Sequence, residues 1–409
     1  MKYKLVSTCV PLALLASAGT AHADLAPWSF GASETIQHDS NVYRSDDSIR
    51  SADWISITEF RGALDQAIGR DRIEAQASVD FNRYKRLKSS DATAYSLAGA
   101  FDWSLPGNVS GKLGADSQRH QYFYGLNGET QSPAGNIETD NHVFANAQLG
   151  GVGRWTIFGG VDANTRRYSN DTFAINNENQ WGVNAGTRYS TTPDLTFGLS
   201  ANYVHGWYPG LRIGGEVDDF STRSIDLTST WQASGNSSLD ARVGYTTQDL
   251  RGQSSKNFVN GALNWTWRPP SHFTVNVGLA RDSNSNTGIG GVVNANDLNG
   301  RSINNSGHLT VTYDLTSKIG LVATAQYAMR HYDDATVPVV TSGGTQLLSA
   351  SGSNRTTSLS LAAHYKPTRT TDLGCSAARE VRHVDTAIRF IGPAYTDTLL
   401  MCTAGIDFR

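Results

Sequence analysis

The residues that decide the fold are Thr398 to Phe408, TLLMCTAGIDF, near the end of the chain. One phase of a two-residue repeat carries only apolar residues, namely Leu400, Cys402, Ala404, Ile406 and Phe408. The other phase carries Met401, Thr403, Gly405 and Asp407. Successive side chains of a β-strand point to opposite faces, so this strand is predicted to touch an apolar medium on one face and water on the other.

The same repeat recurs along the chain from near residue 30. Clear examples are Ile73 to Phe81, Tyr95 to Leu105, Trp155 to Ala163, Leu195 to Tyr203 and Leu359 to Tyr365. We count about eighteen such strands, with sixteen as the alternative. Because only every second residue is apolar, the pattern predicts an all-β fold, a transmembrane antiparallel up-and-down β-barrel in the cell outer membrane.

The first 23 residues have the features of an export signal. Lys2 and Lys4 precede an apolar run, and Ala21-His22-Ala23 fits a small-x-small cleavage site. The predicted organisation is therefore a signal peptide over 1–23 and a single barrel domain over 24–409. The whole chain has 34 basic and 37 acidic residues and a net charge of −3. This mild acidity argues against a nucleic-acid partner.

The expected connections alternate in length. Short turns are predicted at sites such as Gly69 to Asp71, Pro106 to Asn108 and Ser234 to Ser237. Longer polar segments lie between them, and the longest are Gly125–Ile137, Pro209–Asp219, Ser283–Ser302 and Asp333–Gly352. Short periplasmic turns and long extracellular loops are typical of outer-membrane barrels. The rival fold is a soluble β-helix, propeller or sandwich, but Trp and Tyr near the predicted strand ends favour membrane interfaces, and no fixed-length repeat is visible.

A resemblance to a known family is carried by the first third of the chain. The segment His38 to Arg44, HDSNVYR, closes the first predicted strand, and Ile68 to Arg72, Tyr84, Tyr95 and Phe101 to Leu105 follow it. These residues resemble the EpsL-type outer-membrane barrels encoded with exopolysaccharide biosynthesis systems. The resemblance implies a barrel that helps a nascent polysaccharide cross the outer membrane, and it implies no catalytic residues.

The polar phase of the strands should line the lumen, and its charged residues are our lumen candidates. They are Glu59, Arg61, Asp80, Asp102, Lys112, Asp162, Arg166, Arg188, Asp226, Arg242, Arg268, Asp282, Asp314, Arg330 and Arg382. Acids moderately outnumber bases along this phase, whereas a channel for a strongly anionic polymer should show an excess of Arg and Lys. We therefore expect a neutral or weakly charged polymer, or a general solute pore. The same charges could also serve only as a wall held by cross-strand ion pairs.

Three functions remain open at this stage. The first is a passive conduit for exopolysaccharide, with outer loops that set the constriction. The second is a general or substrate-specific porin for small hydrophilic solutes. The third is a non-conducting structural barrel that docks periplasmic export components. The expected partners follow from these: outer-membrane lipid, a polysaccharide or a small solute, and export components.

Several strands carry a cation on the outward phase, just beyond the apolar residues. These candidates for contact with outer-leaflet lipid are Arg83, Lys85, Arg119, Arg167, Arg281 and Arg379. The planar guanidinium of Arg suits the phosphates of that leaflet. The alternative is ordinary solvated charge on strand extensions above the membrane.

Cys375 and Cys402 are the only cysteines after the signal peptide. If the last hairpin turns about Ile388 and Arg389, the two residues lie directly opposite each other on the outward phase. A disulfide is then expected in an oxidising compartment. A slip of one residue would leave two small apolar thiols instead.

No catalytic or cofactor chemistry is predicted. The histidines have no metal-ligand spacing, no cysteine pair fits a zinc site, and no Gly-x-Ser-x-Gly motif is present. We therefore expect a non-enzyme with no metal and no cofactor. The segments Ser283–Asn305 and Asp333–Ser353 are candidates for loops that fold inward as a constriction.

Overall fold

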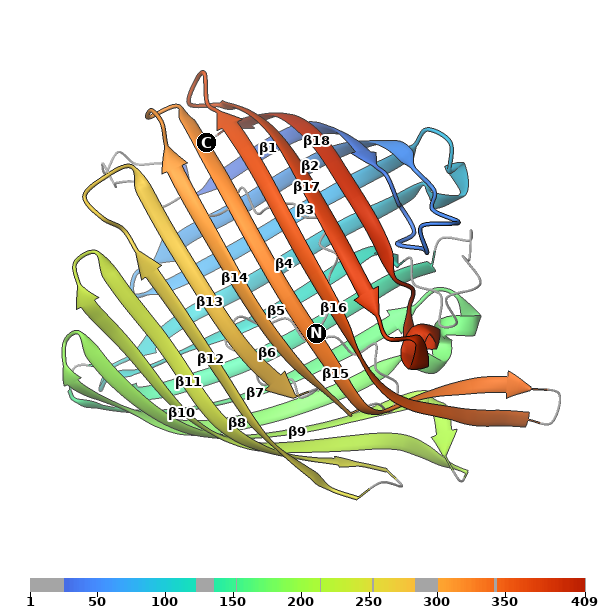
Figure 1. Cartoon of the computed structure of the whole chain (residues 1–409). Helices are drawn as coiled ribbons and strands as arrows, with labels where there is room; N and C mark the ends of the chain where they lie inside the picture. Colours follow the sequence, from blue (N-terminus) through green and yellow to red (C-terminus); the bar gives the residue numbers. More distant parts are fainter. Residues whose placement is uncertain are drawn as a thin grey trace.

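The structure, a computed structural model, describes residues 26–122, 136–151, 153–213, 215–251, 254–283, 301–341 and 344–408. The predicted signal peptide lies outside this range. The described chain forms one sheet of 18 strands that closes on itself (Figure 1). Every strand is antiparallel to its neighbours, and each pairs with the next in sequence. The predicted up-and-down barrel, with the higher strand count, is confirmed.

The strands are long and begin and end as follows. They are β1 Trp28–Asp39, β2 Asp53–Ile68, β3 Asp71–Tyr84, β4 Ala92–Leu105, β5 Val109–Tyr122, β6 Asn136–Gly150, β7 Trp155–Tyr168, β8 Glu178–Thr192, β9 Leu195–Ile213, β10 Glu216–Ser234, β11 Ser237–Leu250, β12 Lys256–Trp267, β13 Phe273–Ser283, β14 Arg301–Asp314, β15 Ile319–Thr341, β16 Gly344–Tyr365, β17 Thr371–Val384 and β18 Tyr395–Phe408. The described parts of the connections contain three short 3₁₀ turns: η2 Lys88–Ser90, η3 Asp171–Asn176 and η4 Thr386–Ile391.

Pairing between the first and last strands closes the barrel. β1 pairs with β18 from Phe30 opposite Phe408 to Asp39 opposite Leu399. On its other edge β1 pairs with β2 along its whole length. Closure leaves no strand edge in the sheet without a partner, as a strand in hydrocarbon requires. No helix in the described part of the chain is long and apolar enough to cross a membrane.

The two faces of the sheet differ as the alternation predicts. The outward face carries large apolar side chains that no other part of the chain covers, such as Ile157, Val243, Leu279, Leu361 and Leu400. Among the described residues, some of the buried hydrophobic side chains gather in three small clusters, around Tyr43 and Tyr84, around Tyr208 and Leu211, and around Tyr332 and Ile388. The largest apolar surface of the barrel is therefore its outer face, where lipid hydrocarbon takes the place of a protein core.

Most connections alternate in length, so the barrel has a short-turn rim and a rim that carries the long connections. By the usual rule these are the periplasmic and extracellular rims. Two segments that were expected to be loops are mostly strand in the structure. Pro209–Asp219 mostly continues β9 and β10, because Tyr208 and Leu211 pack against Phe220 there. Asp333–Gly352 mostly continues β15 and β16.

The β15–β16 hairpin extends beyond the barrel rim and does not fold into the lumen, so the expectation of a constriction from this segment was wrong (Figure 1). Its sequence explains the extension. Thr336 to Val340 is rich in β-branched residues, which favour strands, and it pairs with Thr345 to Ser349. The other candidate constriction, Ser283–Asn305, lies largely outside the described residues, as does Gly125–Ile137.

Candidate functional site

The inward face of the barrel is the candidate site, and most predicted lumen residues lie on it. Each lies on its strand in alternation with exposed outward apolar residues: Glu59, Arg61, Asp80, Asp102, Lys112, Asp162, Arg166, Arg188, Asp226, Arg242, Asp282, Asp314, Arg330 and Arg382. Arg268 is different. It follows the last residue of β12, and its backbone N–H donates to the carbonyl oxygen of Asn236 in the adjacent short turn.

Near the short-turn rim, Arg61 lies between two carboxylates. Its guanidinium is 3.0 Å from Glu59 on the same strand and 2.9 Å from Asp407 on β18. All three side chains are about one-third to one-half exposed, so they face the open part of the lumen. Glu59 also accepts a hydrogen bond from the Ser33 hydroxyl. The cluster therefore links β18, β1 and β2 across the closure of the barrel.

Lys112 on β5 lies between two carboxylates in a similar way. Its Nζ is 2.8 Å from Glu74 on β3 and 3.4 Å from Asp102 on β4. Arg72 pairs with Asp65 and lies 3.5 Å from Glu74, which joins the two basic side chains into one group. These pairs are exposed, and their main consequence is the charge that they present to the lumen.

Nearer the long-connection rim, Arg166 on β7 lies in a buried cluster. Its guanidinium is 2.9 Å from Asp140 and 3.6 Å from Glu138 on β6, and 3.3 Å from Glu178 on β8. All four residues are buried. The sequence analysis identified Arg166 but not the three acids. Like His142, the three acids occupy even-numbered, inward positions. They were missed because they lie near the ends of β6 and β8, beside segments expected to be connections.

The acids of this cluster also come close to a histidine. Ligand atoms of His120, Glu138 and Asp140 lie within 4.8 Å of one another, a spacing that could hold a metal ion. The Arg166 guanidinium already supplies positive charge at both carboxylates, 2.9 Å from Asp140. We therefore assign these residues to an ion-pair cluster rather than to a metal site.

A third cluster surrounds Arg242 on β11. Its guanidinium is 3.2 Å from Asp226 on β10 and 2.6 Å from Asp282 on β13. Asp226 also accepts hydrogen bonds from Asn202 and from the Ser224 hydroxyl. The three predicted lumen candidates Asp226, Arg242 and Asp282 are thus brought together, although they come from three different strands.

Exposure changes along the inward face. Toward the long connections the inward polar side chains are buried almost all the way around the barrel. Examples from well-separated strands are Asp53, Asn136, Glu178, Asp226, Gln248, Asn260, Asn304, Asn354 and Asp397. Toward the short turns, inward residues such as Asp65, Arg72 and Asp102 are exposed or half-exposed. The inward face is therefore open to water in its short-turn half, whereas its polar side chains are mostly covered in its extracellular half.

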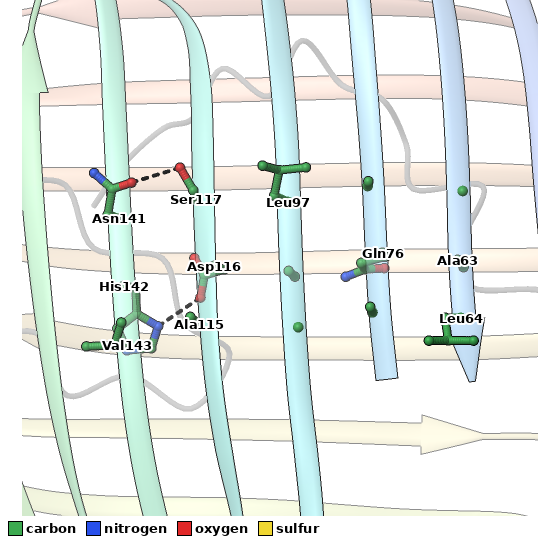
Figure 2. Close-up of a pocket in the computed structure, with 15 residues that line it drawn as sticks. Ala63, Leu64, Gln76, Leu97, Ala115, Asp116, Ser117, Asn141, His142 and Val143 are labelled. Atoms are coloured by element: carbon green, nitrogen blue, oxygen red, sulfur yellow. Dashed lines mark hydrogen bonds and ion pairs between the residues drawn. The ribbon is translucent and has the colours of Figure 1, made fainter. Parts of the chain in front are cut away.

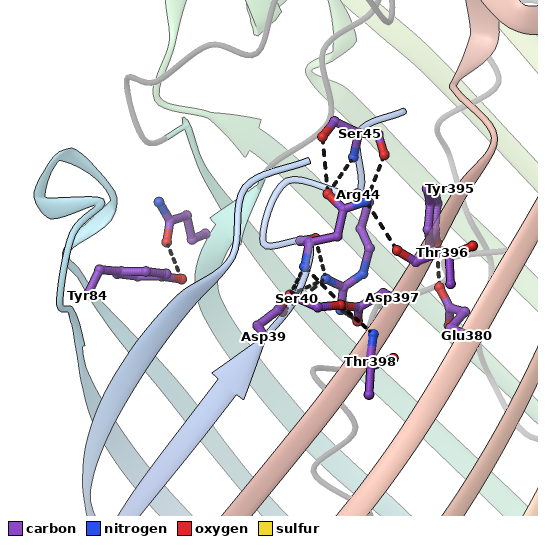
Figure 3. Close-up of polar contacts among 12 residues, drawn as sticks. Asp39, Ser40, Arg44, Ser45, Tyr84, Glu380, Tyr395, Thr396, Asp397 and Thr398 are labelled. Carbon is purple, nitrogen blue, oxygen red and sulfur yellow. Dashed lines mark hydrogen bonds and ion pairs between the residues drawn. The ribbon is translucent and has the colours of Figure 1, made fainter. Parts of the chain in front are cut away.

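The segment Asp39 to Ser45 overlaps the sequence that carries the family resemblance. It folds into a buried polar cluster at the extracellular rim, which we call the rim cluster (Figure 3). Arg44 is 2.9 Å from Asp39 and 3.0 Å from Asp397 on β18. The Asn41 backbone N–H donates to both carboxylates, at 2.8 and 3.1 Å. Burial alone would lower the pKa of Arg44, but attraction from Asp39 and Asp397 outweighs it and raises the pKa. The rim cluster therefore joins the first loop to the last strand by ion pairs and hydrogen bonds.

The predicted lipid contacts are on the outward phase or beside it. Arg83, Arg119, Arg167, Arg281 and Arg379 alternate with inward residues in step with exposed apolar side chains, and Lys85 follows the end of β3. Arg281 donates to Asn305 at 2.9 Å, and Arg83 lies 3.7 Å from Asp91. Their contact with outer-leaflet lipid stays a prediction.

Cys375 and Cys402 form a disulfide between β17 and β18. They lie directly opposite each other in the register, as expected from a turn centred on Ile388 and Arg389. Both are on the outward phase, in step with Leu373 and Leu400.

A groove of about 610 Å³ crosses β2 to β6 (Figure 2). A row of directly paired small residues, Ala75, Gly99 and Ala115, forms its floor between Leu64 and Val143. These residues share the outward phase. The groove therefore belongs to the face that meets acyl chains and is separate from the lumen.

Comparison with known proteins gives structural matches alone. No protein-family model and no curated protein matches the sequence. OpdK of Pseudomonas aeruginosa, solved with vanillate, is 12% identical, covers 93% of this chain and 99% of its own, and has a TM-score of 0.50. A second structure of the same protein, also called OccK1, has a TM-score of 0.51. OccK3 of the same organism reaches 0.49 at 12% identity, with 93% and 96% coverage. This chain is an outer-membrane β-barrel. At this identity the likeness shows the fold and leaves the transported substance open.

Proposed function

We propose that the barrel is a passive channel for small hydrophilic solutes. The observation that carries the proposal is the change of exposure along the inward face. Partly exposed charges in the short-turn half, such as Asp65 and Asp102, fit a water-filled vestibule. Buried polar side chains toward the extracellular rim, such as Glu178 and Asn260, fit a narrow outer half. A wide vestibule that leads to a narrow polar passage suits a small hydrated solute.

Export of a polysaccharide is the second candidate. The family resemblance of residues 38–105 implies it, and one feature of the lumen favours it. Phe144 and Phe158 turn inward opposite Gly114 and Gly186, against which their rings lie closely. Aromatic rings can stack on sugar rings, but a sugar would have to displace the Arg188 guanidinium, 4.3 Å from the centre of the Phe158 ring, and His142, which stacks on Phe144 at 5.5 Å. The narrow extracellular half supports the first candidate over this one.

Two measurements separate these functions. Purified barrel in a planar bilayer should give stepwise ionic conductance, and loss of the gene should slow the uptake of small solutes. If uptake is unchanged while secreted polysaccharide falls, the second candidate replaces the first. A correctly folded barrel that gives no conductance would instead support a structural barrel that docks periplasmic export components.

A further inference from the structure

We propose that the lumen selects for cations, so that cationic or neutral solutes pass more readily than anions. This inference rests on the proposed channel function and adds the charge class of the solute. It depends on two observations: the sorting of charge between the two faces of the wall, and the way in which inward bases share their acidic partners.

Charges are sorted between the two faces of the described strands. At inward positions carboxylates outnumber bases, as in Asp65, Glu74, Asp80, Asp102, Asp116 and Asp162. At outward positions the order is reversed, with Arg83, Arg119, Arg167, Arg223, Arg281 and Arg379. The small net charge of the whole chain, −3, conceals this difference. A permeating ion meets the acidic face alone.

The inward ion pairs leave negative charge over. Arg61 is shared by Glu59 and Asp407, at 3.0 and 2.9 Å. Arg242 is shared by Asp226 and Asp282, at 3.2 and 2.6 Å. Each group has two carboxylates for one guanidinium and keeps one negative charge.

The other two clusters follow the same rule. Arg166 serves Glu138, Asp140 and Glu178, so that cluster has three acids for one base. Lys112 and Arg72 together serve Asp65, Glu74 and Asp102. Ion pairing therefore positions the acids around the lumen without neutralising them.

The excess charge can act on a solute because much of it is exposed to the lumen. The Asp407 and Asp102 carboxylates are 44% and 39% exposed. The screening length at physiological salt is about 8 Å, so a carboxylate on the wall acts on ions that pass within about that distance of it. Acidic side chains that line a pore attract cations and repel anions. The outward arginines lie on the other side of the wall, where they do not face the solute.

The test uses the full mature barrel in a planar bilayer with a KCl gradient. The zero-current potential should have the sign that drives K⁺ down its gradient, with a K⁺/Cl⁻ permeability ratio above 1. The double substitution Asp102→Asn and Asp162→Asn removes two inward charges and should lower the ratio by about twofold. The matched control is Asp249→Asn, the same change at an outward position, where the carboxylate pairs with Arg223. This control should leave the ratio unchanged.

The outcomes separate a failure of the cation-selectivity inference from a failure of the channel function. A ratio of 1 or less, or a ratio that the inward substitutions leave unchanged, overturns the inference and leaves the channel function standing. A barrel whose folding is confirmed by its heat-dependent gel mobility, and which gives no conductance, overturns the channel function and the inference together.

Discussion

The buried rim cluster at the extracellular rim predicts how the substitution Arg44→Met changes the stability of the barrel. Arg44 is the only base in contact with Asp39 and Asp397 among the ion pairs of the described residues, and all three side chains are less than one-tenth exposed. Methionine keeps most of the volume and removes the charge. Two carboxylates are then left buried without a cation.

The size of the effect follows from burial. Removal of one partner from a buried ion pair costs about 3–5 kcal/mol, because the remaining charge keeps its desolvation penalty. Asn41 would lose support as well, since its backbone N–H depends on the same two carboxylates and its side chain is fully buried. We therefore expect the free energy of unfolding to fall by at least about 3 kcal/mol.

The assay is urea unfolding of the barrel refolded in lipid vesicles, followed by tryptophan fluorescence. The matched control is Arg83→Met, the same change at a side chain that is 57% exposed and 3.7 Å from Asp91. An exposed pair of this kind contributes less than about 1 kcal/mol. If both variants lose a comparable free energy of unfolding, the rim cluster does not contribute more to stability than an exposed ion pair.

A triple variant tests the proposed cause directly. If the loss arises from uncompensated charge, adding Asp39→Asn and Asp397→Asn to Arg44→Met should restore most of the stability, because no buried ion then remains. If the loss arises from the missing volume and hydrogen bonds of Arg44, the triple variant should be less stable than the single one. That second result would refute the electrostatic reasoning.

Three further predictions concern single sites. Alkylation without reductant should leave Cys375 and Cys402 unmodified, and replacing both by Ser should cost about 2–4 kcal/mol, because the bond closes a loop of 27 residues. Gly111→Ala should destabilise the barrel by about 1–3 kcal/mol, since its Cβ would stand 2.2 Å from a backbone oxygen of the next strand. Hydrogen bonds from the backbone N–H and hydroxyl of Ser353 lower the pKa of Asp385. The protection factor of the Ser353 amide, its exchange rate relative to the intrinsic rate at the same pH, should therefore be high near neutral pH and should fall as the pH falls through that lowered value.

The sequence predicted the wall of the barrel because the wall depends on local patterns. Alternation fixes which side chains face out, and the centre of the connection between two consecutive strands fixes the register of their hairpin. The disulfide is the clearest case. The pairing of Cys375 with Cys402 follows from the centre of one turn and from the phase of two neighbouring strands.

Contacts that depend on closure were not predicted. Arg44 and Asp397 are 353 residues apart and meet because β18 returns to pair with β1. The acids Glu138 and Glu178 were missed for a related reason, since they lie at strand ends where the alternation gives way to polar connections. The extended hairpin after Trp207 was taken for a loop because its turn residues, Pro209 and Gly210, occur within a strand.

The excess of acid in the lumen is a consequence of sheet geometry as much as of composition. An inward base on any strand of a closed barrel has a neighbour on each side, so it can pair with one acid on each. Arg166 shows this fully, because its direct opposites are Asp140 on β6 and Glu178 on β8. One base can therefore hold two or three carboxylates in place, and a wall stabilised in this way keeps a net negative charge. Ion pairing and cation selectivity are then two results of one arrangement, and the loss of selectivity on neutralising Asp102 need not be accompanied by unfolding, because Lys112 keeps Glu74 as its partner.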